Sequence, residues 1–190
     1  VSDVWSMRTI EVVSKNIVKS INDPEDVDAR ESMMLAASAA GVGFGNAGVH
    51  LPHGMSYAVS GNVKEFTPEG YPQQKPIVPH GLSVILNAPA VFRFTSPSNP
   101  EKHIIAASLL GVDTSNIDEK DAGNAIADKL IELLKDLGMP NGLSGLGYTE
   151  EDVESLVEGT LPQHRVTKLS PIEVGAEELR MLFTNSLKLW

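Results

Sequence analysis

Apolar residues recur at steps of three and four along most of this 190-residue chain, and this spacing restricts the fold more than any other feature. Such spacing places apolar side chains on one face of a helix. It is clearest in residues 4–21, 118–137 and 176–189. No segment alternates apolar and polar residues as a half-buried strand would. We therefore predict an all-α domain over residues 1–190, with about seven to nine helices.

Capping signals mark where several of these helices begin. Asp23 precedes Pro24, which suits the first position of a new helix because proline has no N–H to satisfy there. Residues 98–101 repeat this order of a capping residue and a proline. Thr149 and Asp152 have the spacing of a capping box, in which each side chain bonds the other residue's backbone N–H. Each of these three signals predicts a helix start.

A run of small residues from Met33 to Gly48 includes four glycines among its last eight residues. Because glycine inside a helix costs about 1 kcal/mol relative to alanine, these glycines need a reason. Close approach of a neighbouring helix or a ligand to the backbone would supply one. We favour a tightly packed helix with a break, and the alternative is a loop over residues 41–48.

Two His-Gly pairs, His53-Gly54 and His80-Gly81, each sit where a proline interrupts an apolar segment. A small residue after each histidine would let a metal and a cofactor approach. Between the pairs, residues 61–78 carry the glycines and prolines of a surface loop. A loop this long in a compact domain is often functional or mobile. Pro79 then starts the next helix, so the loop would be able to bring the two pairs together.

The charge and the missing cysteines exclude several classes of function. Fifteen basic residues against 25 acidic ones give a net charge of −10, which argues against a surface for nucleic acid or anionic membrane. The absence of cysteine removes disulfides, thiolate metal sites and cysteine nucleophiles, and fits a reducing compartment. No apolar run reaches the roughly 18 residues of a membrane span.

The first residues of the chain carry no signal for secretion. A basic segment followed by an apolar one is missing, so we do not expect a secreted protein. The helical pattern is already under way at Ser2, and a natural protein seldom begins with valine in mid-helix. We therefore expect a fragment whose missing part lies on the N-terminal side.

Histidines supply the most chemistry in this sequence. Imidazole is a common ligand of zinc, iron and nickel, often with a carboxylate completing the set. His50 and His53 are three residues apart and would share one side of a helix, and the loop would fold His80 back onto them. The alternative is that each is a hydrogen-bonded core residue. We expect His103 and His164 to be surface or capping residues.

Other catalytic and cofactor motifs are missing. The sequence has no Gly-x-Ser-x-Gly nucleophile elbow. The stretch Gly43-Phe44-Gly45 follows no predicted strand, so it does not make a dinucleotide-binding fingerprint. We expect these glycines to serve helix packing.

The stretches GFGNAGVHLPHGMSY and PHGLSVIL resemble the second half of the iron-containing (group III) alcohol dehydrogenases, and the resemblance extends from Ser2 to the C-terminal helix. It implies the helical C-terminal metal-binding domain of a dehydroquinate synthase-like fold. In this family an N-terminal α/β domain binds NAD, and NAD and a divalent metal lie in the cleft between the domains. The resemblance implies Fe²⁺ or Zn²⁺ as the metal.

Within the family, the chain resembles the hydroxyacid-oxoacid transhydrogenase branch, through NAGVH, VPHGLSV, the long loop between the histidines and LPQHRVTKL. Such enzymes oxidise 4-hydroxybutyrate to succinic semialdehyde while reducing 2-oxoglutarate, with bound NAD as the hydride carrier. The alternatives are an NAD-dependent iron-containing alcohol dehydrogenase, an enzyme similar to maleylacetate reductase, and an isolated helical module without activity.

The resemblance assigns roles to individual residues. His53 and His80 match two metal ligands, while the family's other two, an Asp and a His on one helix, should lie before Val1. Tyr57 stands where many members have a histidine that assists proton transfer or contacts the nicotinamide, and a phenol is a poorer base at neutral pH. Tyr57 and His50 are therefore the candidate catalytic residues, and Asn46 and Tyr57 the candidate NAD contacts.

The resemblance also predicts partners and location. Arg165 would meet a substrate carboxylate by a bidentate contact, or is a surface arginine on a loop. The expected partners are a small hydroxyacid or oxoacid and the missing NAD-binding domain, with no nucleic acid or membrane, and a homodimer is left open. The branch implies the cytoplasm in a bacterium and the mitochondrion in a eukaryote.

Overall fold

The computed structural model describes residues 1–72 and 75–190, and this part of the chain is all helical, with no strand. The all-α prediction is confirmed. The α-helices in these ranges are α1 (Ser2–Asn22), α2 (Val27–Ala47), α3 (Leu51–Gly61), α4 (His80–Ile85), α5 (Ala88–Thr95), α6 (Pro100–Leu109), α7 (Ala122–Asp136), α8 (Val153–Thr160), α9 (His164–Thr167) and α10 (Ala176–Leu187). Four short 3-10 helices, η1 (Ser96–Ser98), η2 (Glu119–Asp121), η3 (Leu143–Leu146) and η4 (Glu150–Asp152), join them.

The described helices number ten, slightly more than the sequence predicts. The difference arises at α9, whose four residues are too short to show periodicity. Among these helices none is long and apolar enough to cross a membrane.

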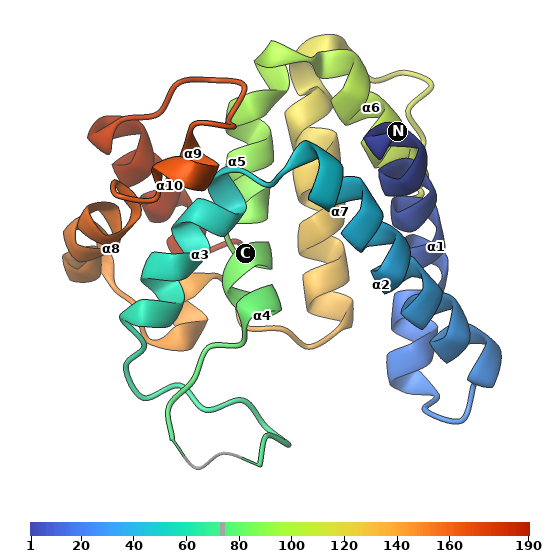
Figure 1. Ribbon diagram of the computed structural model, residues 1–190, viewed down its shortest axis with the longest axis horizontal. Coiled ribbons are helices and arrows are strands. Elements are labelled where there is room, and N and C mark those ends of the chain that lie inside the picture. The colour runs from blue at the N-terminus through green and yellow to red at the C-terminus, as the bar shows by residue number, and fades with distance from the viewer. Residues whose placement is uncertain (73–74) are drawn as a thin grey trace.

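The hydrophobic core lies among α3, α5, α8 and α10, whose labels surround the middle and left of Figure 1. Apolar side chains from these helices and from the residues around η3 interdigitate there. The largest fully buried ones are Tyr148, Phe183, Leu51, Met55, Leu86, Leu143, Leu156, Leu179 and Leu182. The predicted C-terminal helix therefore packs inward, as its apolar stripe indicates.

Helices α1 and α2 form a hairpin at one side of the molecule, drawn in blue in Figure 1. Gly43 is buried in this contact, and a Cβ there would lie 2.5 Å from Ser6 Oγ. Gly41 and Gly45 face open space. The helix predicted through the small-residue run is thus present, but it continues without a break to Ala47, and only one glycine within α2 is required by close packing.

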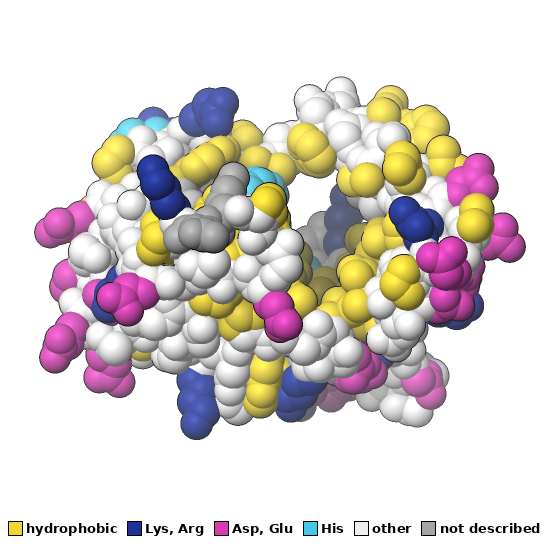
Figure 2. Space-filling view, turned by 90° about the horizontal axis from the view of Figure 1, so that it is seen from below, with side chains coloured by type: hydrophobic (Ala, Val, Ile, Leu, Met, Phe, Trp, Pro, Cys, Tyr) yellow, Lys and Arg dark blue, Asp and Glu magenta, His cyan; other side chains and the backbone are white. Residues whose placement is uncertain are grey.

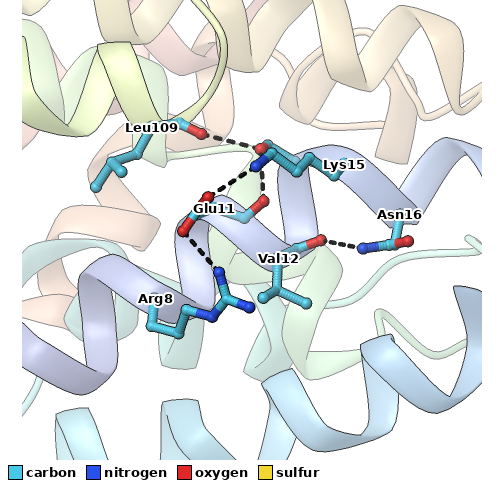
Figure 3. Close-up of polar contacts among 7 residues, drawn as sticks. Arg8, Glu11, Val12, Lys15, Asn16 and Leu109 are labelled. Atoms are coloured by element: carbon cyan, nitrogen blue, oxygen red, sulfur yellow. Dashed lines mark hydrogen bonds and ion pairs between the residues drawn. The ribbon is translucent and has the colours of Figure 1, made fainter.

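The α1 helix contacts the rest of the molecule through α6 as well as through α2. Ser14 Oγ donates a hydrogen bond to the Leu109 carbonyl oxygen at 2.9 Å, and Figure 3 shows this region. Hydrogen bonds from Lys15 and then Arg8 lower the pKa of the Glu11 carboxyl, but such exposed ion pairs contribute little stability. No residue of α1 is fully buried, and Val4 is 69% exposed. Much of its apolar stripe is therefore uncovered in this chain.

The capping predictions differ in accuracy. Asp23 does not cap α2: the turn extends to Asp26, whose side chain accepts from Ala29 N at 2.9 Å. Pro24 therefore lies in the turn and not in the helix. Asn99 does cap α6, accepting from Lys102 N at 3.1 Å, and the Thr149–Asp152 capping box is present.

The predicted loop between α3 and α4 is observed, although its residues 73 and 74 lie outside the described part. Phe66 packs against the core, and its carbonyl oxygen accepts from Ile77 N at 2.8 Å. Ser60 Oγ, near the end of α3, donates to Ser83 Oγ of α4 at 3.0 Å. These contacts hold the two helices side by side.

Tyr148 gives a first prediction. Its ring is 2% exposed, and its hydroxyl donates to the Val59 carbonyl oxygen at 2.6 Å. Tyr148→Phe should lower the free energy of unfolding at pH 7 by about 1–3 kcal/mol, because the buried carbonyl loses its partner. Chemical denaturation measures this, with exposed Tyr71→Phe as a control expected to change little.

The Tyr148 interaction should also depend on pH. Burial, and then the charge of Asp152, raise the pKa of Tyr148 to about 12. A group whose pKa is raised on folding contributes its stability in full below the unfolded value of about 10, and loses it as pH rises to the folded value. The difference in the free energy of unfolding between wild type and Tyr148→Phe should therefore become smaller as the pH rises from 10 to 12. A difference that stays constant over this range would contradict the assignment.

Candidate metal centre

His53 and His80 lie side by side, as the sequence predicts. His53 is in the first turn of α3 and His80 is the first residue of α4. Their ring centroids are 5.3 Å apart, and the rings are tilted by 60°. The Ser60–Ser83 hydrogen bond joins the same two helices, so the fold itself sets this arrangement. That the two imidazoles bind a metal stays a prediction.

The electrostatics of His53 suit a ligand. Partial burial, and then the proximity of His80, lower the pKa of His53. A neutral imidazole is the form that coordinates a metal ion. The two rings therefore remain candidate ligands of a divalent metal. Within residues 1–72 and 75–190, however, no group of three or more histidine and carboxylate side chains is placed to hold a metal.

His50 is the N-cap residue of α3, but its side chain makes no capping hydrogen bond. The prediction that His50 stands with His53 on one helix is wrong, because His50 lies just before the helix. The helix begins at Leu51 because Pro52 favours the first turn of a helix, where its missing N–H is no loss. Burial, and then His53 and His103, lower the pKa of His50. Its Nδ1 is buried and has no hydrogen-bond partner among the described residues. A catalytic role for His50 remains a prediction.

Tyr57 extends the row of rings by one turn of α3. Its ring stacks on His80 with centroids 6.4 Å apart and an interplanar angle of 27°. Its hydroxyl accepts a hydrogen bond from Arg165 Nη2 at 3.3 Å. Arg165 belongs to α9 and not to a loop. The structure therefore brings Arg165 to the end of the row formed by His53, His80 and Tyr57.

The two glycines that follow the histidines differ in their surroundings. A Cβ on Gly54 would lie 2.8 Å from Thr167 Cγ2 and 3.4 Å from Val166 Cγ2, whereas one on Gly81 would meet nothing within 4 Å. Gly54 is therefore small because α9 packs against α3 there. The interpretation that each glycine makes room for a metal and a cofactor is wrong for Gly54, whose space α9 occupies.

A second prediction compares these glycines. Gly54→Ala should lower the free energy of unfolding by about 1–3 kcal/mol, because the added methyl group overpacks the contact with Thr167. Gly81→Ala in α4 is the matched control, and should be neutral or slightly stabilising because alanine is the better helix former. Thermal unfolding of both variants measures this. An equal melting temperature for the two would contradict the packing role of Gly54.

The remaining predicted residues lie elsewhere. Asn46 is exposed in the last turn of α2, where its Nδ2 donates to Ser2 Oγ at 2.9 Å, so its role as an NAD contact stays a prediction. His103 is half-buried in α6, with Nδ1 2.8 Å from the Asn99 carbonyl oxygen and its ring edge-on to Phe92. His164 is exposed at the start of α9, in agreement with a surface role.

The molecule is hollowed between the α1–α2 hairpin and the rest of the chain. Figure 2 shows this opening, with apolar side chains around it and histidine side chains at its rim. Of the paired histidines, His80 is exposed and His53 is half-buried, so the pair lies at the surface of the molecule.

The chain is similar to known proteins both in sequence and in structure. Residues 1–187 match the model of the Fe-containing alcohol dehydrogenase family, C-terminal. The chain is 54% identical over its whole length to a probable mitochondrial hydroxyacid-oxoacid transhydrogenase of Dictyostelium discoideum, covering 35% of that protein. It is 51% identical over its whole length to the mitochondrial hydroxyacid-oxoacid transhydrogenase of Xenopus laevis, covering 41% of it.

A solved structure of 1,3-propanediol oxidoreductase superposes with a TM-score of 0.85 at 25% sequence identity. The superposition covers 97% of this chain and 45% of the other. The chain thus spans less than half of the length of these similar proteins.

Proposed function

The chain belongs to the Fe-containing alcohol dehydrogenase family, whose C-terminal part it matches, and from this premise we propose that it contributes to a hydroxyacid-oxoacid transhydrogenase. The reaction would oxidise 4-hydroxybutyrate to succinic semialdehyde and reduce 2-oxoglutarate to 2-hydroxyglutarate, with NAD carrying the hydride. The observation that carries the proposal is the His53–His80 pair, whose ring centroids are 5.3 Å apart. The chain that holds this pair is 54% and 51% identical to two relatives that are named as hydroxyacid-oxoacid transhydrogenases.

The metal's place follows from the two histidines. His53 and His80 would supply two neutral nitrogen ligands to Fe²⁺ or Zn²⁺, and the lowered pKa of His53 supports this. When bound, such a metal acts as a Lewis acid on a substrate oxygen. The remaining ligands and the NAD site would come from the portion of these proteins that the chain does not match.

The chain's other residues would position the substrate. Tyr57 lies beside His80 and its hydroxyl is free to turn between Arg165 and a substrate oxygen, because the 3.3 Å contact with Arg165 leaves the phenolic proton unused. Tyr57 would therefore orient the substrate oxygen. His50, close to His53 and half-buried, is the other candidate for handling a proton, and Asn46 remains a candidate NAD contact.

The proposed location follows the names of the relatives. The Dictyostelium and Xenopus proteins are named as mitochondrial, so we propose the mitochondrion if this chain comes from a eukaryote and the cytoplasm if it comes from a bacterium. A homodimer is proposed as the assembly to test first.

The proposal is tested on the gene product that carries this chain, expressed in full and purified. With 4-hydroxybutyrate and 2-oxoglutarate, and without added NAD, we expect succinic semialdehyde to form, and we expect no formation when 2-oxoglutarate is omitted. No turnover here, together with strong NAD-dependent oxidation of 1,3-propanediol, would reject the transhydrogenase. It would favour a simple alcohol dehydrogenase, as the similarity to 1,3-propanediol oxidoreductase also does.

A further inference from the structure

Arg165 is a positively charged side chain that the fold brings close to the histidine pair. Its Nη2 lies 3.3 Å from the Tyr57 hydroxyl, and the Tyr57 ring stacks on His80. Arg165 and Tyr57 are 108 residues apart in sequence, so their contact depends on α9 packing against α3. Buried Val166 and the Gly54–Thr167 contact fix α9 in this position.

The Arg165 guanidinium is exposed and has no ion-pair partner among the described residues. The other four arginines have partners that are carboxylates or a backbone carbonyl. These are Arg8 with Glu11 at 2.8 Å, Arg93 with Asp128 at 2.5 Å, Arg180 with Glu154, and Arg30 with the Pro24 carbonyl at 2.9 Å. The hydrogen bond with Tyr57 leaves the charge of Arg165 uncompensated, so its remaining N–H groups are available to an anion.

We propose that Arg165 determines specificity by binding the carboxylate of the hydroxyacid and oxoacid substrates. This inference rests on the proposed function. Both substrates carry a carboxylate at a distance from the reacting carbon, and a planar guanidinium binds a carboxylate through two parallel hydrogen bonds. In a chain with a net charge of −10, an unpaired guanidinium beside the site also offsets the general repulsion of an anionic substrate.

Tyr57 would link specificity to the reacting end of the substrate. Its hydroxyl contacts Arg165 and its ring contacts His80, so the carboxylate and the reacting oxygen of one small molecule would be held on either side of the tyrosine. A simple alcohol lacks the carboxylate and would gain nothing from Arg165. The residue therefore separates acids from alcohols as substrates and takes no part in hydride transfer.

The test uses the gene product in full, with Arg165→Gln, Arg165→Lys and, as a matched control, Arg180→Gln, whose arginine pairs with Glu154. The substrates are 4-hydroxybutyrate and 1,4-butanediol, which replaces the carboxylate by an uncharged CH₂OH group. Arg165→Gln should raise KM for 4-hydroxybutyrate about 10- to 100-fold, the size of a lost charge-assisted hydrogen bond. The kcat, the metal content and the KM for butanediol should change less than about twofold.

The KM of Arg165→Lys for 4-hydroxybutyrate should lie between those of wild type and Arg165→Gln, because lysine keeps the charge but cannot make two parallel hydrogen bonds. Arg180→Gln should behave as wild type. Equal effects of Arg165→Gln on both substrates, or none, would overturn the inference. Calorimetric binding of 2-oxoglutarate decides it independently of turnover: Arg165→Gln must weaken binding about tenfold or more. Binding that is unchanged, or absent in wild type, would overturn it. Loss of transhydrogenation with this binding difference intact would instead count against the proposed function alone.

Discussion

Replacing His53 or His80 by alanine, in the gene product that carries this chain, should remove most of the bound metal and lower kcat at least about 100-fold. The two rings lie 5.3 Å apart on separate helices, and each would supply one ligand. Changes to residues that merely support metal ligands already cost 10- to 100-fold, so the loss of a ligand should cost more. Elemental analysis of the purified protein and steady-state kinetics measure the two effects.

His164→Ala is the matched control for these variants. His164 is exposed at the start of α9 and is not part of the row of rings. It should leave metal content and kcat within about twofold of wild type. If His53→Ala and His80→Ala keep full metal content and activity, the assignment of the two histidines as ligands is wrong.

Gly142→Ala should lower the free energy of unfolding by about 2–6 kcal/mol, the largest stability effect that we expect from a single methyl group. Gly142 has φ +64, and a Cβ there would lie 2.5 Å from the Leu187 carbonyl oxygen and 2.6 Å from that of Ser186. With φ +64 and ψ −166, Gly142 lies in a backbone region that essentially only glycine adopts, which costs a residue with a Cβ about 1–3 kcal/mol, and overpacking adds about 1–3 kcal/mol. The atoms contacted are backbone at the end of α10, which cannot rotate away.

Gly138→Ala separates the two causes. Gly138 also has φ +64, but a Cβ there would meet nothing within 4 Å. Gly138→Ala should lower the free energy of unfolding only by the cost of a left-handed backbone, about 1–2 kcal/mol. Urea denaturation of both variants gives the comparison. Equal losses for the two would show that the contact with α10 is not tight.

Several helices could be predicted from the sequence because their signals are local. The Thr149–Asp152 capping box and the Asn99–Pro100 start depend on residues three or fewer positions apart, and both are observed. The start of α2 was harder to predict, because Asp23 and Asp26 are both acceptable N-caps and only the length of the turn selects Asp26. Local signals predict that a helix begins there, but they predict its first residue less accurately.

The site was predictable where it followed motifs and unpredictable where it depended on packing. The two His-Gly motifs identified His53 and His80, and the resemblance to the iron-containing alcohol dehydrogenases that they carry is confirmed by the match over residues 1–187. The position of His50 was predicted wrongly, because the helix begins at Leu51, with Pro52 in its first turn, and leaves His50 outside it.

The contact between Arg165 and Tyr57 had no local signal in the sequence. It depends on a four-residue helix, α9, that is too short to show periodicity. Only the buried face of that helix, against Gly54, gives the contact a physical reason. A pattern at helical spacing cannot report a contact between residues 108 positions apart.

The transfer of deuterium between the two substrates tests the central proposal most directly. The gene product in full is incubated with 2-oxoglutarate and 4-hydroxybutyrate that carries deuterium at C4, in ordinary water and without added NAD. We predict 2-hydroxyglutarate with one deuterium at C2, detected by mass spectrometry, because bound NAD would pass the same hydride from one substrate to the other. Unlabelled 2-hydroxyglutarate, or none, would contradict the account.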